Sequence, residues 1–454
     1  MQRSLVTGPI ARNIFVFALP LMAGNLLQQM YNVADTWVVG RFLGSNALAA
    51  VGSSFTLMTF LTSIILGLCM GNGAAVSIQY GAGEYRKMRQ SIFMSFVLIG
   101  GITVFLNVIV YAGLDTLLWI LQVPQEIQDL MKDYLVIIFM GIIAVFLYNY
   151  FANLLRAIGN SMIPLIFLAV SAVLNVVLDV VCILIFHWGV AGAAVATVFS
   201  QYAAGIGIGV YALKKFPMLR PKKEDWQWEK KTLSVILNLS LMTSLQQSIM
   251  NFGILMVQGL VNSFGTTIMA AFAAAVKIDA FAYMPVQDFG NAFSTFVAQN
   301  YGAGQKERIR KGIFSAGITS MIFCVIISTT VFFLAKPLME IFIDPGKTQM
   351  IAEGVRYLRI EGACYAGIGI LFLLYGYYRA INLPIMSVIL TIVSLGTRVF
   401  LAYTLSGIAA IGVTGIWISV PIGWILADII GVFYLVKNKK GKKERDLYGR
   451  KRAV

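Results

Sequence analysis

Long apolar stretches, separated by short polar segments, recur along this chain. Twelve of them reach the roughly 20 residues that a helix needs to cross the hydrocarbon core of a membrane. They lie at about 14–38, 47–74, 90–113, 133–155, 162–187, 190–213, 233–262, 267–298, 312–334, 355–378, 384–405 and 411–436. Lipid cannot satisfy free backbone polar groups, and the stretches lack the two-residue alternation of a membrane barrel. The pattern therefore predicts an all-α polytopic membrane protein.

The second half of the sequence repeats motifs of the first half. Tyr-Gly-Ala-Gly at 80–83 returns 221 positions later at 301–304, and Arg-Ala-Ile at 156–158 returns at 379–381. A series of matches at a nearly constant offset indicates duplication, so the twelve helices divide into two pseudo-symmetric six-helix bundles. Two similar halves in an apolar protein are typical of a transporter with its binding site between or inside the halves.

This duplication predicts four parts of the chain. They are an N-terminal six-helix lobe, a cytoplasmic linker, a C-terminal six-helix lobe and a basic cytoplasmic tail, at 1–213, 214–232, 233–436 and 437–454.

Composition and charge placement support a membrane protein. Hydrophobic residues make up 59% and charged residues 12% of the chain, against about 25% charged residues in soluble domains. Of the 35 Lys and Arg residues, 27 lie in segments on one side of the predicted helices. By the positive-inside rule these segments face the cytoplasm, so we predict a multi-pass protein of the inner membrane with both termini cytoplasmic. The basic tail is expected to contact membrane lipids, which leaves the net charge of +15 without a role in binding nucleic acid.

The residue types of common cofactor sites are sparse. The four cysteines are isolated inside apolar stretches, and His187 is the only histidine, so no zinc or disulfide framework is predicted. The chain also lacks the Gly-x-x-x-x-Gly-Lys-Ser/Thr motif of ATP binding. We expect no cofactor, no enzymatic activity and a monomer that takes its energy from an ion gradient.

Ionisable residues inside the apolar stretches of the first half indicate a coupling site. Asp35 lies in the first stretch, Asn175 and Asp179 lie on one face of the fifth, and Thr197 lies in the sixth at a similar depth. Their hard oxygens suit Na⁺. Alternatively, two neighbouring carboxylates repel each other, so that one of them can carry a proton near neutral pH. A purely structural role, in which each polar group bridges neighbouring helices, remains the other interpretation.

Pro20 lies in the middle of the first stretch, 15 residues before Asp35. Proline removes a backbone hydrogen bond and permits a kink. The kink is either static or a hinge that responds to protonation of the nearby carboxylates.

The chain resembles the multidrug and toxic compound extrusion (MATE) family, and within it the DinF-like bacterial branch, over about residues 10–436. The elements that carry the resemblance are Pro20, Asp35, Gln-Tyr-Gly-Ala-Gly at 79–83, Arg-Ala-Ile-Gly-Asn at 156–160, Asn-Val-Val-Leu-Asp at 175–179, Gly-Ala-Ala-Val-Ala-Thr at 192–197 and Gln-Asn-Tyr-Gly-Ala-Gly at 299–304. The resemblance implies an antiporter that expels amphipathic, often cationic drugs while H⁺ or Na⁺ enters. It places the coupling site at Asp35, Asn175, Asp179 and Thr197.

The second half departs from relatives that have a coupling site there, because its seventh stretch carries no carboxylate. In the eighth stretch, Lys277 either lines a substrate cavity or forms a buried ion pair, and Asp279 points to another side of that helix. Arg398 and Glu361 are predicted to form a structural ion pair. The candidate substrate-cavity residues are Gln28, Asn32, Gln247, Met250, Asn251, Lys277, Tyr283, Met284 and Tyr375.

Four functions fit a two-lobed membrane protein. The favoured one is a secondary active antiporter that exports drug-like compounds by alternating access. A flippase for lipid-linked oligosaccharide would need more Arg and Lys residues in its interior than this sequence offers, because those side chains bind phosphate groups. A channel would not need buried carboxylates, and a membrane-embedded prenyl transferase would need clustered aspartates, which the sequence lacks.

Overall fold

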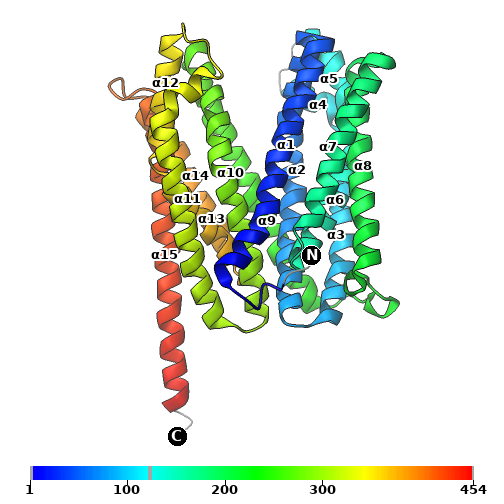
Figure 1. Cartoon of the computed structure of the whole chain (residues 1–454), viewed down its shortest axis with the longest axis vertical. Coiled ribbons are helices and arrows are strands. Elements are labelled where there is room, and N and C mark those ends of the chain that lie inside the picture. Colours follow the sequence, from blue (N-terminus) through cyan, green and yellow to red (C-terminus); the bar gives the residue numbers. More distant parts are fainter. Residues whose placement is uncertain (1–3, 121–124, 452–454) are drawn as a thin grey trace. The chain divides into compact units, whose positions relative to one another are not determined.

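The computed structural model describes residues 4–120 and 125–451, and within these ranges helices form without any strand (Figure 1). Residues 1–3, 121–124 and 452–454, which include the ends of the predicted first lobe and basic tail, lie outside the described residues. The helices of the first half are α1 (Ile10–Leu43), α2 (Ser45–Gly81), α3 (Tyr85–Ala112), α4 (Leu114–Ile120), α5 (Gln125–Ile138), α6 (Gly141–Ala157), α7 (Met162–Val180), η1 (Val181–Ile185) and α8 (Gly189–Lys215). Those that follow are η2 (Pro217–Leu219), η3 (Lys223–Asp225), α9 (Lys230–Asn262), α10 (Thr266–Gly302), α11 (Lys306–Glu340), α12 (Thr348–Gly362), α13 (Tyr365–Ala380), α14 (Pro384–Ser406) and α15 (Thr414–Lys451).

Ten helices in the described part of the chain are long and apolar enough to cross a membrane. Two further pairs, α5 with α6 and α12 with α13, pass the same test together but bend by 44° and 52° at a short break. Counting each bent pair as one span gives twelve, and the predicted all-α polytopic fold is confirmed. The predicted spans at 133–155 and 355–378 are therefore present as bent pairs, each broken for two residues within an otherwise apolar run.

The repeated Tyr-Gly-Ala-Gly motif forms the same turn twice. At the end of α2 the N–H of Gly83 donates to the carbonyl oxygen of Tyr80 at 3.1 Å, and at the end of α10 Gly304 donates to Tyr301 at 3.1 Å. Gly83 and Gly304 have φ angles of 72° and 70°, in the left-handed region where a side chain is strained and glycine is favoured. The duplication read from the sequence is therefore also present in the backbone.

The described residues divide into two compact units. Unit 1 comprises 1–248, 295–312 and 380–382, and unit 2 comprises 249–294, 313–379 and 383–454. This division cuts through α9, α10, α11 and α13 and assigns short pieces of the second half to unit 1. The predicted lobe and linker boundaries therefore remain a prediction.

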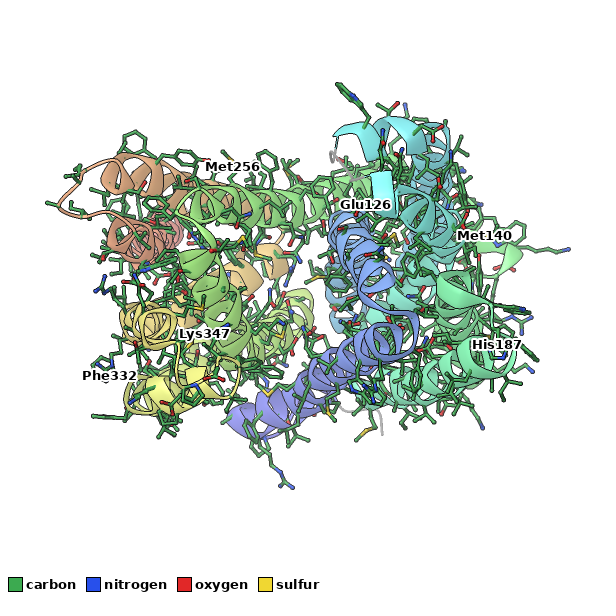
Figure 2. The ribbon with its side chains drawn as sticks, turned by 90° about the horizontal axis from the view of Figure 1, so that it is seen from above. Glu126, Met140, His187, Met256, Phe332 and Lys347 are labelled. Atoms are coloured by element: carbon green, nitrogen blue, oxygen red, sulfur yellow. The ribbon has the colours of Figure 1, made fainter. Side chains whose placement is uncertain are left out.

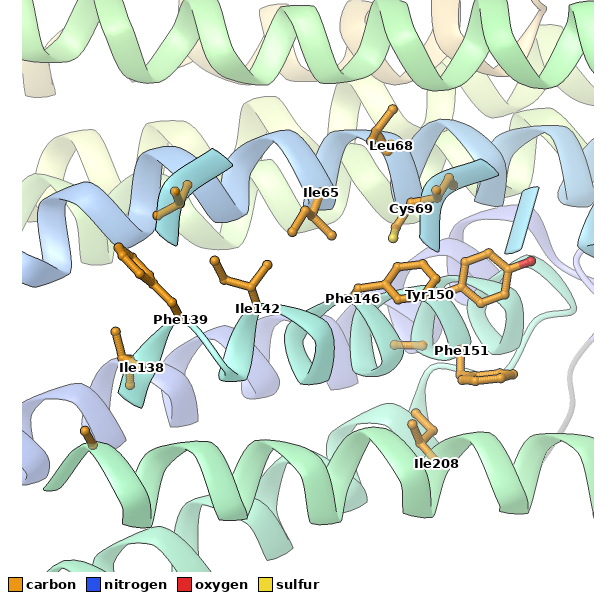
Figure 3. Close-up of a cluster of buried hydrophobic side chains, with 14 of the residues drawn as sticks. Ile65, Leu68, Cys69, Ile138, Phe139, Ile142, Phe146, Tyr150, Phe151 and Ile208 are labelled. Carbon is orange, nitrogen blue, oxygen red and sulfur yellow. The ribbon is translucent and has the colours of Figure 1, made fainter. Parts of the chain in front are cut away.

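The core of unit 1 lies where α2, α5 and α6 pack together. Ile65, Ile142, Phe146 and Tyr150 are buried there (Figure 3), and the rings of Phe146 and Tyr150 lie 5.5 Å apart. The Tyr150 hydroxyl donates to the carbonyl oxygen of Ile92 at 2.6 Å. Lipid chains are as apolar as leucine, so close packing and such hydrogen bonds hold these helices together.

Unit 2 has its own aromatic core. The rings of Phe272 and Trp417 stack at 5.2 Å, and Tyr357 meets Trp417 edge-on at 5.0 Å. Figure 2 views the helices from above, with Phe332 and Lys347 labelled among those of unit 2 and His187 among those of unit 1. Each unit is thus a helical bundle with an internally packed core.

The segment between α8 and α9 is attached to unit 1 by a buried carboxylate. Arg89 of α3 donates from Nε to Oδ2 of Asp225 at 2.6 Å, and the backbone N–H of Lys222 donates to the same oxygen at 2.9 Å. Burial acts to raise the pKa of the Asp225 carboxyl, but these two bonds outweigh it and hold the pKa below its usual value. Trp226 stacks on Phe93 of α3 at 5.5 Å, so the segment is ordered against the bundle.

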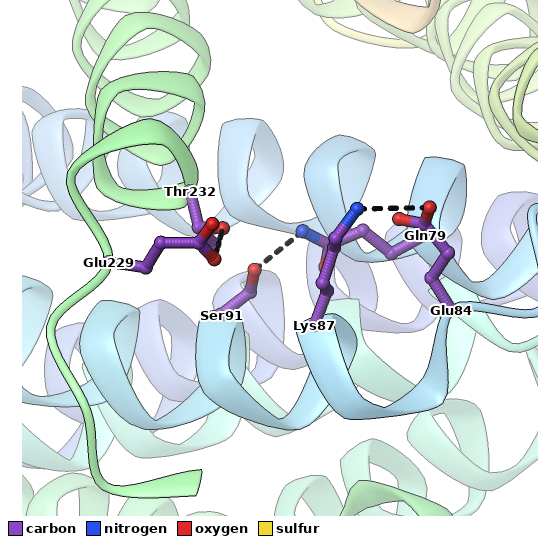
Figure 4. Close-up of polar contacts among 6 residues, drawn as sticks. All are labelled: Gln79, Glu84, Lys87, Ser91, Glu229 and Thr232. Atoms are coloured by element: carbon purple, nitrogen blue, oxygen red, sulfur yellow. Dashed lines mark hydrogen bonds and ion pairs between the residues drawn. The ribbon is translucent and has the colours of Figure 1, made fainter.

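Side-chain hydrogen bonds also fix the start of α3 and of α9 (Figure 4). Gln79 Nε2 donates to the Ser91 hydroxyl at 2.6 Å, which joins the end of α2 to α3. The Thr232 hydroxyl donates to Glu229, which precedes the first residue of α9, at 2.7 Å. Both bonds join two side chains, and they tie residues near helix ends to their neighbours.

Candidate ion-coupling site

Polar side chains from three helices meet inside unit 1. Asp35 comes from α1, Asn175 and Asp179 from α7, and Thr197 from α8. Asn175 is 1%, Asp179 0% and Thr197 6% exposed, while Asp35 is partly buried with its Oδ1 inaccessible. The structure therefore brings together the four residues that the sequence nominates for ion coupling. We call them, with Tyr31, the first cluster.

Neutral donors in the first cluster converge on one hydroxyl. Asn175 Nδ2 donates to Thr197 Oγ1 at 3.2 Å, and the Tyr31 hydroxyl donates to the same atom at 3.5 Å. Asn175 and Asp179 are one helical turn apart, so both face α1 and α8. The side-chain oxygen of Asn175 is inaccessible and accepts no hydrogen bond from the described residues.

The two carboxyl groups of the first cluster are neighbours without a cation. Asp35 and Asp179 lie close enough to interact directly, yet neither oxygen of Asp179 makes a hydrogen bond of good geometry. No Lys or Arg in the described residues forms an ion pair with either group. Two unneutralised carboxylates side by side repel strongly in a dry interior, so a bound proton or metal cation stabilises the pair. Chemically, this arrangement can accept a proton or a small cation.

Sequence reasoning missed two tyrosines beside this pair. Tyr31 lies one turn before Asp35 on α1, and buried Tyr134 of α5 lies near both carboxyl groups. Tyr31 could have been found from its spacing of four residues to Asp35. Tyr134 could not, because it comes from a different helix at no informative spacing.

The helix that carries Asp179 changes its winding immediately afterwards. α7 ends at Val180 and continues as a π-helical turn, η1. Such turns are rare in proteins as a whole. Those that occur often lie at functional sites, because they displace side chains relative to a regular helix. Here the π turn sets Asp179 at the junction of two windings.

A second buried carboxylate pair lies in unit 2. Asp279 of α10 and Glu361 of α12 are 5% and 1% exposed and interact with each other. Tyr365 donates to Asp279 Oδ1 at 2.6 Å, and Tyr357 donates to Glu361 Oε2 at 2.9 Å. Arg398 of α14 acts on both carboxyl groups electrostatically. We call these five residues the second cluster.

The second cluster corrects one prediction from the sequence. Arg398 and Glu361 form no direct ion pair among the described residues, and the Nε of Arg398 has no hydrogen-bond partner. Instead, Glu361 sits at the break between α12 and α13, where its partners are Asp279 and Tyr357. The grouping was missed because the break falls in an apolar run.

Comparison with known proteins assigns the chain to a family. The sequence profile of the MatE family matches residues 20–181 and 239–404, which is most of the chain. The chain belongs to the MATE family. It is 29% identical to the probable multidrug resistance protein YpnP of Bacillus subtilis over 429 residues, covering 94% of this chain and 95% of that protein. It is 23% identical to the FAD transporter of Shewanella oneidensis, covering 96% of each chain.

The fold of this MATE transporter matches solved structures. A crystal structure of MATE in the bent conformation superposes with a TM-score of 0.91 at 22% identity, covering 97% of this chain and 98% of that one. The chain is thus a multi-pass membrane protein with the MATE fold. The assignment to the DinF-like branch stays a prediction.

The remaining candidate residues of this MATE protein lie in both units. α1 continues as a helix through buried Pro20, and its role as a hinge remains a prediction. Lys277 is exposed and forms no ion pair in the described part of the chain, so the buried-pair interpretation does not hold. Tyr375 is 7% exposed and packs against α14, where Ser387 donates to its carbonyl oxygen.

The other cavity candidates are more accessible. Gln28 is exposed. The partly exposed ones are Asn32, Gln247, Met250, Asn251, Tyr283 and Met284. Their role in binding substrate remains a prediction. No group of three or more His, Cys, Asp and Glu residues suited to a metal ion occurs among the described residues. A Na⁺ ion at the first cluster would therefore need the amide and hydroxyl oxygens of Asn175 and Thr197 in addition to the carboxylates.

Proposed function

We propose that this MATE protein is a secondary active antiporter that exports amphipathic, often cationic compounds in exchange for H⁺ or Na⁺. The observation that carries the proposal is the Asp35–Asp179 pair, two neighbouring carboxyl groups that no Lys or Arg of the described residues pairs with. An ionisable group within a membrane is costly and usually has a function. A pair of them is stabilised by one exchangeable cation, which is the property that an ion-coupled carrier needs.

Coupling follows if the ion and the drug favour different states of the protein. A proton or Na⁺ at the first cluster removes the repulsion between Asp35 and Asp179, whereas a cationic drug favours the state in which both are ionised. Tyr31, Asn175 and Thr197 provide neutral oxygens and donors that adjust to either state. Loading the ion therefore promotes drug release, and drug binding promotes ion release.

The names of related proteins support drug-like substrates. Relatives include proteins named for multidrug resistance or export, which do not favour the flippase alternative. The FAD transporter of Shewanella oneidensis adds a flavin nucleotide as a second compound to test. We propose the inner membrane as the location and the cytoplasm for both termini, because the Lys and Arg residues are concentrated on one side of the helices.

The test is transport by purified protein in proteoliposomes with an imposed pH or Na⁺ gradient. Ethidium is the cationic probe, and FAD is tested in parallel. We expect gradient-dependent ethidium movement in the wild type, no such movement in Asp35→Asn, and wild-type rates in Asp129→Asn, whose carboxylate is exposed on α5. Equal gradient-driven transport by wild type and Asp35→Asn would contradict the proposal, as would transport that ignores both gradients.

A further inference from the structure

The two copies of the Tyr-Gly-Ala-Gly motif lie against each other within unit 1. A Cβ atom on Gly81 would fall onto the carbonyl oxygen of Gln299 and 2.7 Å from its Cα. A Cβ atom on Gly302 would fall onto the carbonyl oxygen of Ile78 and 2.9 Å from the N of Ala82. The ends of α2 and α10 are therefore in direct backbone contact. We call this contact, formed by residues 78–83 and 299–304, the glycine joint.

The glycine joint has the symmetry of the duplication. The offset of 221 residues carries Gly81 onto Gly302 and Ile78 onto Gln299. Each glycine thus meets the carbonyl oxygen of the residue three positions before the other glycine. Only glycine lets two helix backbones approach this closely, because any side chain would have to displace a peptide group. The joint is where the two repeats meet through equivalent atoms.

Hydrogen bonds fasten the second-repeat side of the joint to the first repeat. Gln299 Nε2 donates to the carbonyl oxygen of Ala157 at 2.8 Å, and Asn300 Nδ2 donates to that of Leu5 at 3.1 Å. Arg308 Nη2 donates to the carbonyl oxygen of Thr7 at 2.9 Å. These bonds reach segments far away in the sequence, which explains why residues 295–312 group with unit 1.

The joint nevertheless leaves buried polar atoms unpaired. The side-chain oxygens of Gln79, Gln299 and Asn300 are inaccessible and have no hydrogen-bond partner. An unpaired buried acceptor is destabilising relative to a hydrated one. Exposing these atoms to water would recover part of that cost, so the joint is less stable than its close packing implies.

We propose that the glycine joint is a lock between the repeats, closed in this structure, that opens and closes once in each transport cycle. The inference rests on the proposed alternating access, in which the two repeats must move relative to each other. Gly81 and Gly302 make the closed lock possible, and the unpaired amide oxygens lower the cost of opening it. Opening brings Gln299 and Asn300, both 0% exposed, into contact with water.

The test measures exposure of the joint during transport. The four native cysteines are replaced by alanine, and Gln299→Cys is introduced as the single reporter. The rate of labelling by membrane-permeant N-ethylmaleimide is measured in proteoliposomes with and without ethidium and an ion gradient. The matched control is Ala152→Cys, which is equally buried in the core of α6. We expect turnover to accelerate labelling at position 299 by about tenfold and to leave labelling at position 152 unchanged.

A second pair of variants tests the glycines themselves. In the reporter background, Gly81→Ala places a methyl group on the backbone carbonyl of residue 299 and should raise labelling there without turnover. Gly52→Ala on the same helix is the control, because a Cβ there meets nothing within 4 Å. If Gly81→Ala does not fold, labelling of the Gln299→Cys reporter during turnover still tests the lock.

The outcomes separate the lock from the antiport proposal. Protection of the reporter cysteine while ethidium transport is measured in the same vesicles would overturn the lock. Gradient-dependent labelling of that cysteine without any transport of ethidium or FAD would support the lock and contradict the proposed export function.

Discussion

The two buried carboxylate pairs differ in what neutralises them. In the first cluster, Asp35 and Asp179 have amide and hydroxyl neighbours and no cation. In the second cluster, tyrosine hydroxyls donate to Asp279 and Glu361, and Arg398 supplies a positive charge nearby. Under the proposed function, the first pair takes its cation from outside the protein, whereas the second has hydroxyl donors and a positive charge within the protein. This contrast suggests ion exchange for the first cluster and a structural role for the second.

Matched aspartate substitutions should separate the clusters most clearly. Asp179→Asn removes one of the two charges that hold the exchangeable ion, and we expect gradient-driven ethidium transport to fall by about a hundredfold. Asp279→Asn keeps an acceptor for Tyr365 and should lower transport by less than about threefold. Initial rates in proteoliposomes at equal protein content measure both. Similar losses in the two variants would abolish the distinction.

Removing the positive charge of Arg398 should destabilise the second cluster and leave the first cluster unchanged. Arg398→Gln leaves Asp279 and Glu361 buried without positive charge, and we expect a loss of about 3 kcal/mol in stability. Adding Glu361→Gln removes one carboxylate and should restore most of that loss. Thermal unfolding in detergent gives the comparison. Should the double variant be less stable than Arg398→Gln, compensation by Arg398 would not explain the cluster.

Asp225 provides the reference for a fully paired carboxylate outside the membrane-spanning helices. Its pKa is lowered in the folded protein, so its pairing stabilises the fold above the pKa of an unfolded aspartate, and this contribution disappears as the pH falls through the lower folded pKa. Asp225→Asn should cost about 2 kcal/mol near neutral pH and should reduce the loss of stability in acid. Thermal unfolding between neutral pH and about pH 3 compares the variant with wild type. An unchanged acid sensitivity would show that Asp225 does not contribute to it.

The smallest effects are expected from single hydroxyl groups. Thr197→Val removes the acceptor shared by Asn175 and Tyr31, and Tyr365→Phe removes a donor to Asp279, each at a cost of about 1 kcal/mol in stability. Only Thr197→Val should also change the dependence of transport on Na⁺ or pH. If Tyr365→Phe changes that dependence to the same extent, the second cluster takes part in coupling.

The sequence predicted the helical class and the composition of the first cluster for physical reasons. Apolar length identifies spans, and a spacing of four residues places Asn175 and Asp179 on one face whatever the tertiary structure. Asp35 and Thr197 could be added because depth in a membrane follows from position along a helix.

The second cluster and the glycine joint could not be predicted in the same way. The break after Gly362 lies in an apolar run, so no sequence signal indicated that Glu361 would reach Asp279 on another helix. The repeated glycines were evident, but only coordinates show that the two copies touch each other. Contacts between helices depend on packing, which a single sequence does not specify.

The central claim is that one exchangeable cation at Asp35 and Asp179 competes with the drug. The most direct test is ethidium binding to purified protein in detergent, measured by fluorescence across a range of pH and of Na⁺ concentration. We predict that affinity weakens as H⁺ or Na⁺ increases, and that Asp35→Asn combined with Asp179→Asn abolishes this dependence. Binding that responds to H⁺ and Na⁺ equally in the wild type and the double variant would contradict the account.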